Sequence, residues 1–269
     1  MRVLFLGDIV GRAGRDLVLE TLPEVRQKLK LDFVAVNGEN AAGGFGITGK
    51  ICAALYEAGV DVITTGNHAW DQPETASYID SDPKLLRPLN YPAGAPGKGA
   101  NLYQTTKGRR VLVINVMGRI FMDPLDDPFA AVNQVLARHP LGGAADFILV
   151  DMHGEATSEK MAMGHFCDGR ASLVVGTHSH VPTADAQIFD GGTAYQTDAG
   201  MCGDYNSVIG MEKDEPIRRF TRKISGGRFS PAMGPATLCG VFVETGNDGK
   251  AVAVSPLRLG GRLKEQWPG

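Results

Sequence analysis

The sequence of 269 residues is short of several features that would assign it to a common class. Its four cysteines, Cys52, Cys167, Cys202 and Cys239, include no C-x-x-C pair. That spacing excludes a zinc ribbon or a thioredoxin-type motif and favours a reducing compartment. No apolar run approaches the ~20 residues that span a bilayer, and the apolar run at the N-terminus is too short for a secretory signal. We therefore expect a cytoplasmic protein that makes no membrane contact.

An excess of positive charge is also absent. The chain has 27 Lys and Arg against 30 Asp and Glu, and its net charge is −3. It therefore lacks the broad basic field that grips long nucleic acid by its phosphates. A small anionic substrate remains open, because local cations or metal ions could bind it. Hydrophobic residues make up 43% of the chain, which is enough for a sizeable core. No linker looks long enough to separate independent units, so residues 1–269 are predicted to form a single domain.

Short apolar runs alternate with helical patterns along most of the chain. The runs lack alternation, are β-branched and end at turn residues, as buried parallel strands do. They cover residues 3–6, 33–36, 60–64, 111–116, 147–150 and 173–175, with helical patterns at 17–29, 51–58, 73–79 and 129–138. Three later runs, 193–197, 238–245 and 251–259, look antiparallel, with a hairpin turn at 247–249. These patterns predict an α/β fold with a mixed sheet system.

Polar clusters follow five of the predicted strands. The carboxyl ends of parallel strands meet at one edge of a sheet, where open α/β folds bind their ligands. Four of the six histidines belong to these clusters. The cluster residues that we single out are Asp8, Glu39, Asn40, Asn67, His68, His153, His178 and His180.

Each cluster by itself has an ordinary structural explanation. Asp8 could cap the helix that follows, Asn40 and Asn67 could bond their own backbones in turns, and an isolated histidine such as His153 is more often structural. Packing, however, gives no reason to gather two carboxylates, two carboxamides and three imidazoles at one sheet edge. Left unpaired there, these groups would be costly. Together they favour a metal site.

The types of ligand indicate which metals the site would take. Carboxylate, amide oxygen and imidazole without any thiolate suit manganese, iron or zinc. Seven ligands are too many for one four-coordinate zinc and about right for two ions that share a bridging carboxylate. We expect two metal ions per chain, with iron or manganese favoured and zinc left open.

The strand-end motifs are also familiar as a set. They are GDIVG at 7–11, NGENA at 37–41, TGNH at 65–68, HGE at 153–155 and GTHSH at 176–180, with TDAGM at 197–201 and SVIG at 207–210. In this order they resemble the calcineurin-like metallophosphoesterase superfamily and, more closely, its YmdB-like branch. The resemblance implies a sandwich of two mixed β-sheets flanked by helices, with the metal site at the C-terminal ends of the strands.

The chain departs from the general superfamily pattern at two places. An Asp-x-His motif is replaced by Asp8-Ile9-Val10, and a bridging Asp by Glu39; both changes are usual in the YmdB-like branch. The resemblance then implies two ligand sets that share Glu39. One ion would be held by Asp8, Glu39, Asn40 and His180, and the other by Glu39, Asn67, His153 and His178.

The resemblance also implies an activity. The YmdB-like branch is associated with phosphodiesterase action, notably on small 2′,3′-cyclic nucleotides. We expect a metal-bridging hydroxide to attack phosphorus, with His68 as the general acid, because histidine exchanges protons near neutral pH. A phosphomonoesterase, an amidohydrolase and a metal-binding regulatory protein with slow turnover remain alternatives. An uncoordinated His68 argues against the last of these.

Three further features of the sequence could lie near the site. Residues 44–51 nearly spell a P-loop but have Ile51 where a hydroxyl is needed, so we interpret them as a glycine-rich loop over the metal site, with Thr48 capping the next helix. Asp198, Tyr205 and Ser207 are weaker candidates for the mouth of the site. A basic run is predicted to be a solvated helix face, with phosphate binding or contact in a homo-oligomer left open. It comprises Arg218, Arg219, Arg222, Lys223 and Arg228.

Overall fold

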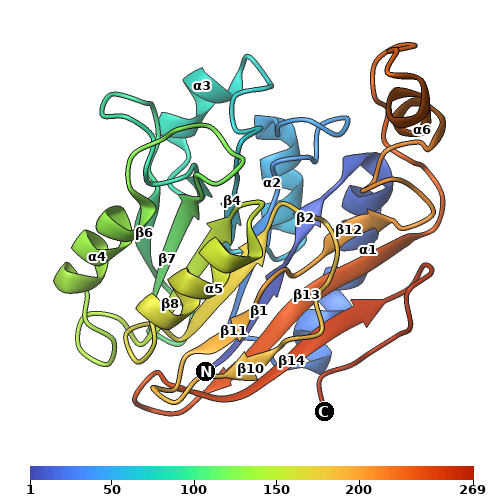
Figure 1. Ribbon diagram of the computed structural model, residues 1–269. Helices are drawn as coiled ribbons and strands as arrows, with labels where there is room; N and C mark the ends of the chain where they lie inside the picture. Colours follow the sequence, from blue (N-terminus) through green and yellow to red (C-terminus); the bar gives the residue numbers. More distant parts are fainter.

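The computed structural model covers residues 1–269 and consists of two β-sheets packed face to face, with helices outside them (Figure 1). The larger sheet has the order β2 (Asp8–Ile9), β12 (Met201–Asp204), β13 (Ala236–Thr245), β1 (Arg2–Leu6), β3 (Phe33–Asn37), β4 (Val62–Thr64) and β5 (Leu85–Leu86), with β14 (Ala251–Leu259) also paired to β13. The smaller sheet has the order β10 (Gln187–Ile188), β11 (Ala194–Gln196), β9 (Leu173–Thr177), β8 (Phe147–His153), β7 (Arg110–Met117) and β6 (Ala100–Gln104).

Both sheets are mixed, as predicted. In the larger sheet β1 is parallel to β3 and antiparallel to β13. In the smaller sheet β7 is parallel to β8 and antiparallel to β6. The hairpin between β13 and β14 confirms the predicted turn at 247–249.

The central strands β1, β3, β8 and β9 are buried on both faces, which explains why their sequences do not alternate. In β1, Val3 and Phe5 join the core between the sheets, where they meet side chains such as Phe147 of the smaller sheet. Leu4 and Leu6 point the other way, into the core under the helices. A strand covered on both sides has no solvated face to mark with polar residues. The core between the sheets draws on both of them, which supports the prediction of one domain.

Helices cover the outer face of each sheet (Figure 1). α1 (Gly11–Lys28) and α2 (Gly49–Glu57) pack on the larger sheet, and α4 (Pro128–Arg138) and α5 (Thr157–Phe166) on the smaller one. α3 (Thr75–Tyr78) runs into a 3₁₀ turn, Ile79–Ser81, and α6 (Asp214–Arg222) stands apart from both layers. Thr48 caps α2 as predicted, since its hydroxyl accepts from the Ile51 amide. None of the helices has the length and apolarity needed to cross a bilayer.

Two sequence predictions need correction. The run at 193–197 was predicted to be antiparallel, but β11 is parallel to β9 and antiparallel only to the short edge strand β10. The prediction is confirmed for the pairing with β10 and wrong for the pairing with β9, because the chain returns through the loop after β9 and through β10 before β11 begins. The first helix starts at Gly11 rather than at residue 17. Strands β2, β5, β6, β10 and β12 and helix α5 were not predicted.

Candidate metal centre

The predicted polar residues meet at the carboxyl ends of strands from both sheets. Asp8 follows β1, Glu39 follows β3 and Asn67 follows β4, all in the larger sheet. His153 is the last residue of β8, and His178 comes directly after β9. The predicted place of the cluster, at the strand ends, is therefore confirmed. Asp8 does not cap the first helix, whose N-cap position is occupied by Val10 without a side-chain bond.

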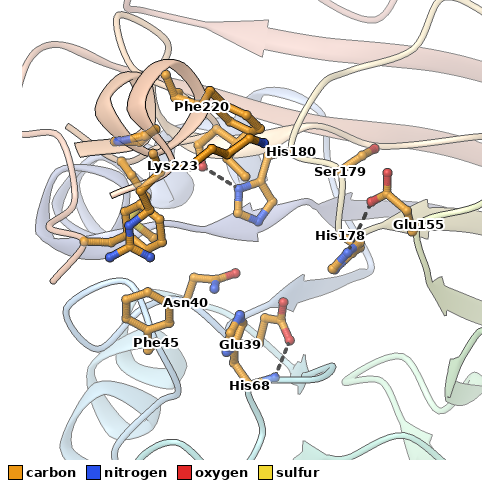
Figure 2. Close-up of a pocket in the computed structure, with 16 residues that line it drawn as sticks. Glu39, Asn40, Phe45, His68, Glu155, His178, Ser179, His180, Phe220 and Lys223 are labelled. Carbon is orange, nitrogen blue, oxygen red and sulfur yellow. Dashed lines mark hydrogen bonds and ion pairs between the residues drawn. The ribbon is translucent and has the colours of Figure 1, made fainter. Parts of the chain in front are cut away.

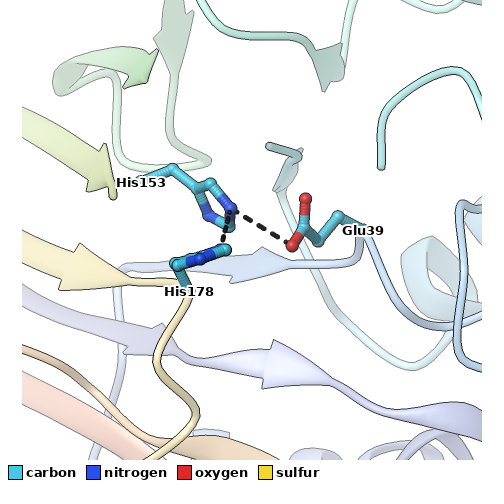
Figure 3. A group of neighbouring side chains, drawn as sticks. All are labelled: Glu39, His153 and His178. Atoms are coloured by element: carbon cyan, nitrogen blue, oxygen red, sulfur yellow. Dashed lines mark hydrogen bonds and ion pairs between the residues drawn. The ribbon is translucent and has the colours of Figure 1, made fainter. Parts of the chain in front are cut away.

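Glu39, His153 and His178 form the first group that could hold a metal ion (Figure 3). His153 Nε2 lies 3.2 Å from Glu39 Oε1, 3.2 Å from His178 Nδ1 and 2.9 Å from Asn67 Oδ1. The strand end that carries Asn67 approaches closely because residue 66 is glycine. A Cβ at Gly66 would lie 2.3 Å from the His153 ring and 2.4 Å from Glu39 Oε2.

Hydrogen bonds behind this group decide which ring nitrogens face it. Thr177 Oγ1 donates to Asp151 Oδ1 at 2.7 Å, so it accepts from His153 Nδ1–H at 2.9 Å and leaves Nε2 facing the group. His178 Nε2 lies 3.3 Å from the Glu155 carboxylate, which can only accept, so Nδ1 of His178 faces the group with a lone pair. The two facing nitrogens lie 3.2 Å apart, which is the spacing of two ligands of one cation, since metal–nitrogen bonds of about 2.0–2.1 Å place neighbouring ligand atoms about 3 Å apart.

Asp8, Glu39 and His180 form the second group, so Glu39 belongs to both. His180 Nδ1 donates to the Ile209 carbonyl at 2.8 Å, which leaves the lone pair on Nε2, 3.8 Å from Asp8 Oδ1. The Asn40 amide nitrogen donates to the Gly44 carbonyl at 3.0 Å. Asp8 Oδ1 and Asn40 Oδ1 are both buried without any hydrogen-bond partner. An unpartnered buried oxygen is costly, and a cation would satisfy both atoms.

The charges and pKa values of the cluster also favour a bound cation. Asp8 and Glu39 are buried, and their ion pairs are with histidines alone. Burial raises the pKa of Asp8 to about 7, despite the two histidines beside it. Burial opposes charge on Glu39 and on His153 as well, but their mutual attraction lowers the pKa of Glu39 to about 2 and raises that of His153 to about 9. Glu39 thus already has a positive partner in His153, whereas no lysine or arginine offsets the burial of the Asp8 carboxylate.

The loop that carries His178 and His180 is held in an uncommon backbone conformation. Their φ angles are 95° and 64°, values that non-glycine residues rarely adopt. Between them, the amide and the hydroxyl of Ser179 donate to Asp198 Oδ2 at 3.1 and 2.7 Å. The same oxygen accepts from Lys160 Nζ at 2.8 Å, and both side chains of that ion pair are buried.

The sequence patterns did not predict that Lys160 and Asp198 hold the loop of His178 and His180 in place. Lys160 lies on the unpredicted helix α5, and Asp198 was placed at the mouth of the site. Asp198 is instead fully buried behind the loop. Tyr205 and Ser207 do not line the cavity either; the Tyr205 hydroxyl donates to the His180 carbonyl at 3.2 Å.

His68 lies beside the cluster rather than within either group. Its amide donates to Glu39 Oε2 at 3.1 Å, and its ring packs edge-on against Phe45 with centroids 5.1 Å apart. His68 Nδ1 is 2.7 Å from the Asp71 carboxylate, so Nδ1 carries the hydrogen in that pair and Nε2 stays free. Asp71 was not predicted, although its position three residues after His68 was a usable signal. Glu155, beside His178, was quoted only as part of a motif.

A cavity of about 600 Å³ opens over both groups (Figure 2). His68, Glu39, Asn40, His178 and His180 line one part of it. Phe45, from the glycine-rich stretch at 44–51, also lines the cavity, which confirms the predicted place of that loop.

The basic run divides between two environments. Arg218, Arg222 and Arg228 are exposed, as a solvated face requires. Arg219, which is half-buried, and Lys223, which is exposed, line the cavity.

Comparison with known proteins gives the chain a family. The family described as YmdB-like protein matches residues 4–257. The chain is 48% identical over 244 residues to the 2′,3′-cyclic-nucleotide 2′-phosphodiesterase of Bacillus subtilis, and the match covers 91% of each protein.

Two solved structures are similar to this chain. A hypothetical protein from Thermus thermophilus has 45% identity and a TM-score of 0.90, with 97% of this chain and 100% of that chain covered. A novel phosphatase from Mycoplasma pneumoniae has 34% identity and a TM-score of 0.89, with 97% and 93% covered. The chain therefore belongs to the YmdB-like family, the branch of the calcineurin-like metallophosphoesterases that its strand-end motifs resemble.

Proposed function

We propose that this chain is a two-metal phosphodiesterase that hydrolyses small phosphodiesters, in particular 2′,3′-cyclic nucleotides. Family membership and the name of the Bacillus subtilis relative support an enzyme that acts on phosphoric ester bonds. The observation that carries the two-metal part is the pair of ligand groups that share Glu39, all buried except the half-buried His178. The unpartnered oxygens of Asp8 and Asn40 add a second, independent argument for a cation between the strand ends.

The two ions would divide the ligands as the family pattern implies. Asp8, Asn40 and His180 would complete one site with Glu39, and Asn67, His153 and His178 would complete the other with the same carboxylate. Nitrogen and oxygen donors without thiolate favour iron or manganese. The ring nitrogens that face the sites are the ones left free by the bonds to Thr177, Glu155 and the Ile209 carbonyl.

Two cations held there would stabilise charge on the phosphoryl oxygens and acidify a water for attack on phosphorus. The chain's own contribution to the reaction is the His68–Asp71 pair. Asp71 fixes the hydrogen on His68 Nδ1 and orients the ring, so Nε2 is left to carry the proton that the departing ester oxygen needs. Opening a 2′,3′-cyclic phosphate at its 2′ ester would join phosphorus to the oxygen of a water that has released one proton to solvent, and it would break the P–O2′ bond. The proton goes from His68 to O2′, and the product is a 3′-phosphate.

A small substrate is favoured over a polymer. The net charge is −3, and Arg219 and Lys223 are the only basic residues other than histidine that line the cavity. Long RNA would need many more phosphate contacts to bind at physiological salt.

Elemental analysis and a substrate panel on the metal-loaded protein test this proposal. We expect two ions per chain, and faster hydrolysis of 2′,3′-cyclic AMP and bis-p-nitrophenyl phosphate than of p-nitrophenyl phosphate or an anilide. Preference for the monoester would indicate a phosphomonoesterase, and preference for the anilide an amidohydrolase. Two bound ions with negligible turnover would favour a regulatory protein. Cleavage of long RNA at a rate comparable to that of cyclic AMP would contradict the argument from charge.

A further inference from the structure

We propose that helix α6 and the loop after it form a binding surface for the nucleobase of the substrate, with Phe220 as the stacking face. This inference rests on the proposed function and deepens it, because it assigns the half of the cavity that the metal ligands do not use.

The cavity has two chemically different halves. The half over the strand ends carries the carboxylate, amide and imidazole groups of the candidate metal centre. The other half is apolar, and Figure 2 shows Phe220 and Lys223 there, across the cavity from Glu39 and His68. The apolar lining residues are Val208, Ile209, Met211, Pro216, Phe220 and Phe229, together with Phe45, which lies on the His68 side of the cavity. A cyclic nucleotide has the same division, with a charged phosphate at one end and a flat, weakly polar base at the other.

Arg219 holds the apolar half in shape. Its guanidinium bonds Glu215 Oε1 at 2.7 Å, Ser225 Oγ at 3.1 Å and the Gly227 carbonyl at 2.7 Å. The same group lies over the Phe229 ring, 3.9 Å from its centroid. Three of its five N–H donors are used in this way, so Arg219 ties the loop to α6.

Phe220 is the side chain best placed to meet a base. It lines the cavity and yet is 74% exposed, so one face of its ring has no partner within the chain. An aromatic ring left open at the rim of a site gains by stacking on another flat ring, and such stacking tolerates any base. Ile217 lies on the same helix and is 51% exposed, but it does not line the cavity. It therefore provides a matched control.

The lining also predicts how selective this surface would be. Apart from Arg219 and Lys223, no side chain of the apolar half carries a hydrogen-bonding group that could read a base edge. Recognition would then depend on stacking alone. We expect purine and pyrimidine cyclic nucleotides to be accepted, with purines preferred for their larger rings.

The test compares two substrates that differ only in the base: 2′,3′-cyclic AMP and the 2′,3′-cyclic phosphate of methyl riboside. Stacking on one base is worth ~5-fold to 100-fold in binding, so Phe220→Ala should raise KM for cyclic AMP by about tenfold. KM for the base-free ester should stay unchanged, Ile217→Ala should resemble the wild type on both substrates, and Phe220→Trp should restore the low KM. Equal KM values for cyclic AMP in Phe220→Ala and the wild type would overturn the inference.

Two other outcomes can be distinguished from a missing base surface. If Phe220→Ala and Ile217→Ala both change the sedimentation coefficient and impair both substrates alike, the exposed face of α6 is a contact between copies of the chain, and the base surface is rejected. If the wild type hydrolyses neither cyclic phosphate, the proposed function fails. Calorimetry with adenosine 3′-phosphate and methyl riboside 3-phosphate then decides the base surface by itself. Tighter binding of the adenosine compound, lost in Phe220→Ala, supports it, and equal binding refutes it.

Discussion

Lys160 Nζ lies 2.8 Å from Asp198 Oδ2, and neither side chain of this ion pair reaches solvent. The pair connects helix α5 to the loop that carries His178 and His180, because Asp198 also accepts both hydrogen bonds from Ser179. Removing one partner of a buried pair leaves an uncompensated charge in the interior.

We expect Lys160→Met to lower the free energy of unfolding by ~3–5 kcal/mol, because the Asp198 carboxylate would lose its counterion. Chemical denaturation measures this change. The control is Lys107→Met, which breaks the pair with Asp32 on the surface, where the Lys107 side chain is 71% exposed; its cost should be ~0–1 kcal/mol. Equal effects of the two substitutions would contradict the role given to Lys160. The double variant Lys160→Met, Asp198→Asn should recover part of the loss.

Each ligand group should lose its own ion when a ligand is removed. His178→Ala or Asn67→Ala should lower the metal content from two ions to about one and abolish turnover, and His180→Ala should do the same for the other ion. Elemental analysis of the purified variants measures this. His139 belongs to no cluster, so His139→Ala should keep both ions. A metal content of no more than one ion per chain in the metal-loaded wild type would contradict the two-metal proposal.

Chelation should destabilise the protein as well as inactivate it. Asp8 Oδ1 and Asn40 Oδ1 have no partner from the chain, and a bound cation stabilises the folded state in proportion to its affinity. We expect the melting temperature to fall on removal of the metals and to recover when iron or manganese is added back. An unchanged melting temperature in the chelated protein would argue that these two oxygens do not meet a metal.

His68→Ala should keep both ions and lose ~10²–10⁴-fold in kcat on cyclic nucleotides, since their leaving oxygen needs a proton. The loss on bis-p-nitrophenyl phosphate should be far smaller, because p-nitrophenolate leaves readily without one. Asp71→Asn should show a smaller loss with the same dependence on the leaving group, because Asp71 acts through His68. Equal losses on both substrates with the metals retained would point to positioning or charge stabilisation instead.

Acid should weaken the pairing between Asp146 and Arg110. The hydrogen bonds from Arg110 lower the pKa of Asp146, so the charged carboxylate stabilises the fold above its ordinary pKa of about 3.9, and this stabilisation is lost as the pH falls further. Asp146→Asn should therefore lower the melting temperature at pH 7, and its difference from the wild type should shrink below pH ~4. Asp190→Asn, at an exposed position without an ion pair, should match the wild type at both pH values.

Much of the site could be predicted from the sequence, because each strand and the polar residues after it are encoded in one short stretch of the chain. Buried runs such as the one at 3–6 predicted the strands, and parallel strands bring their carboxyl ends to one edge. That reasoning placed Asp8, Glu39 and His153 together although they are far apart in the chain. The ligand roles, the identity of the metals and the single domain stay predictions that the geometry supports.

Only the tertiary structure decided what depends on pairing between distant segments. β11 turned out parallel to β9 because of the path through β10, which no local pattern encodes. Lys160 looks like any helix lysine until the fold buries it against Asp198. The basic run was predicted to be a solvated helix face, but the fold places Arg219 and Lys223 in the lining of the cavity over the strand ends. Periodicity records which face of a segment is buried, but which partner it meets is set by how the two sheets and their helices pack.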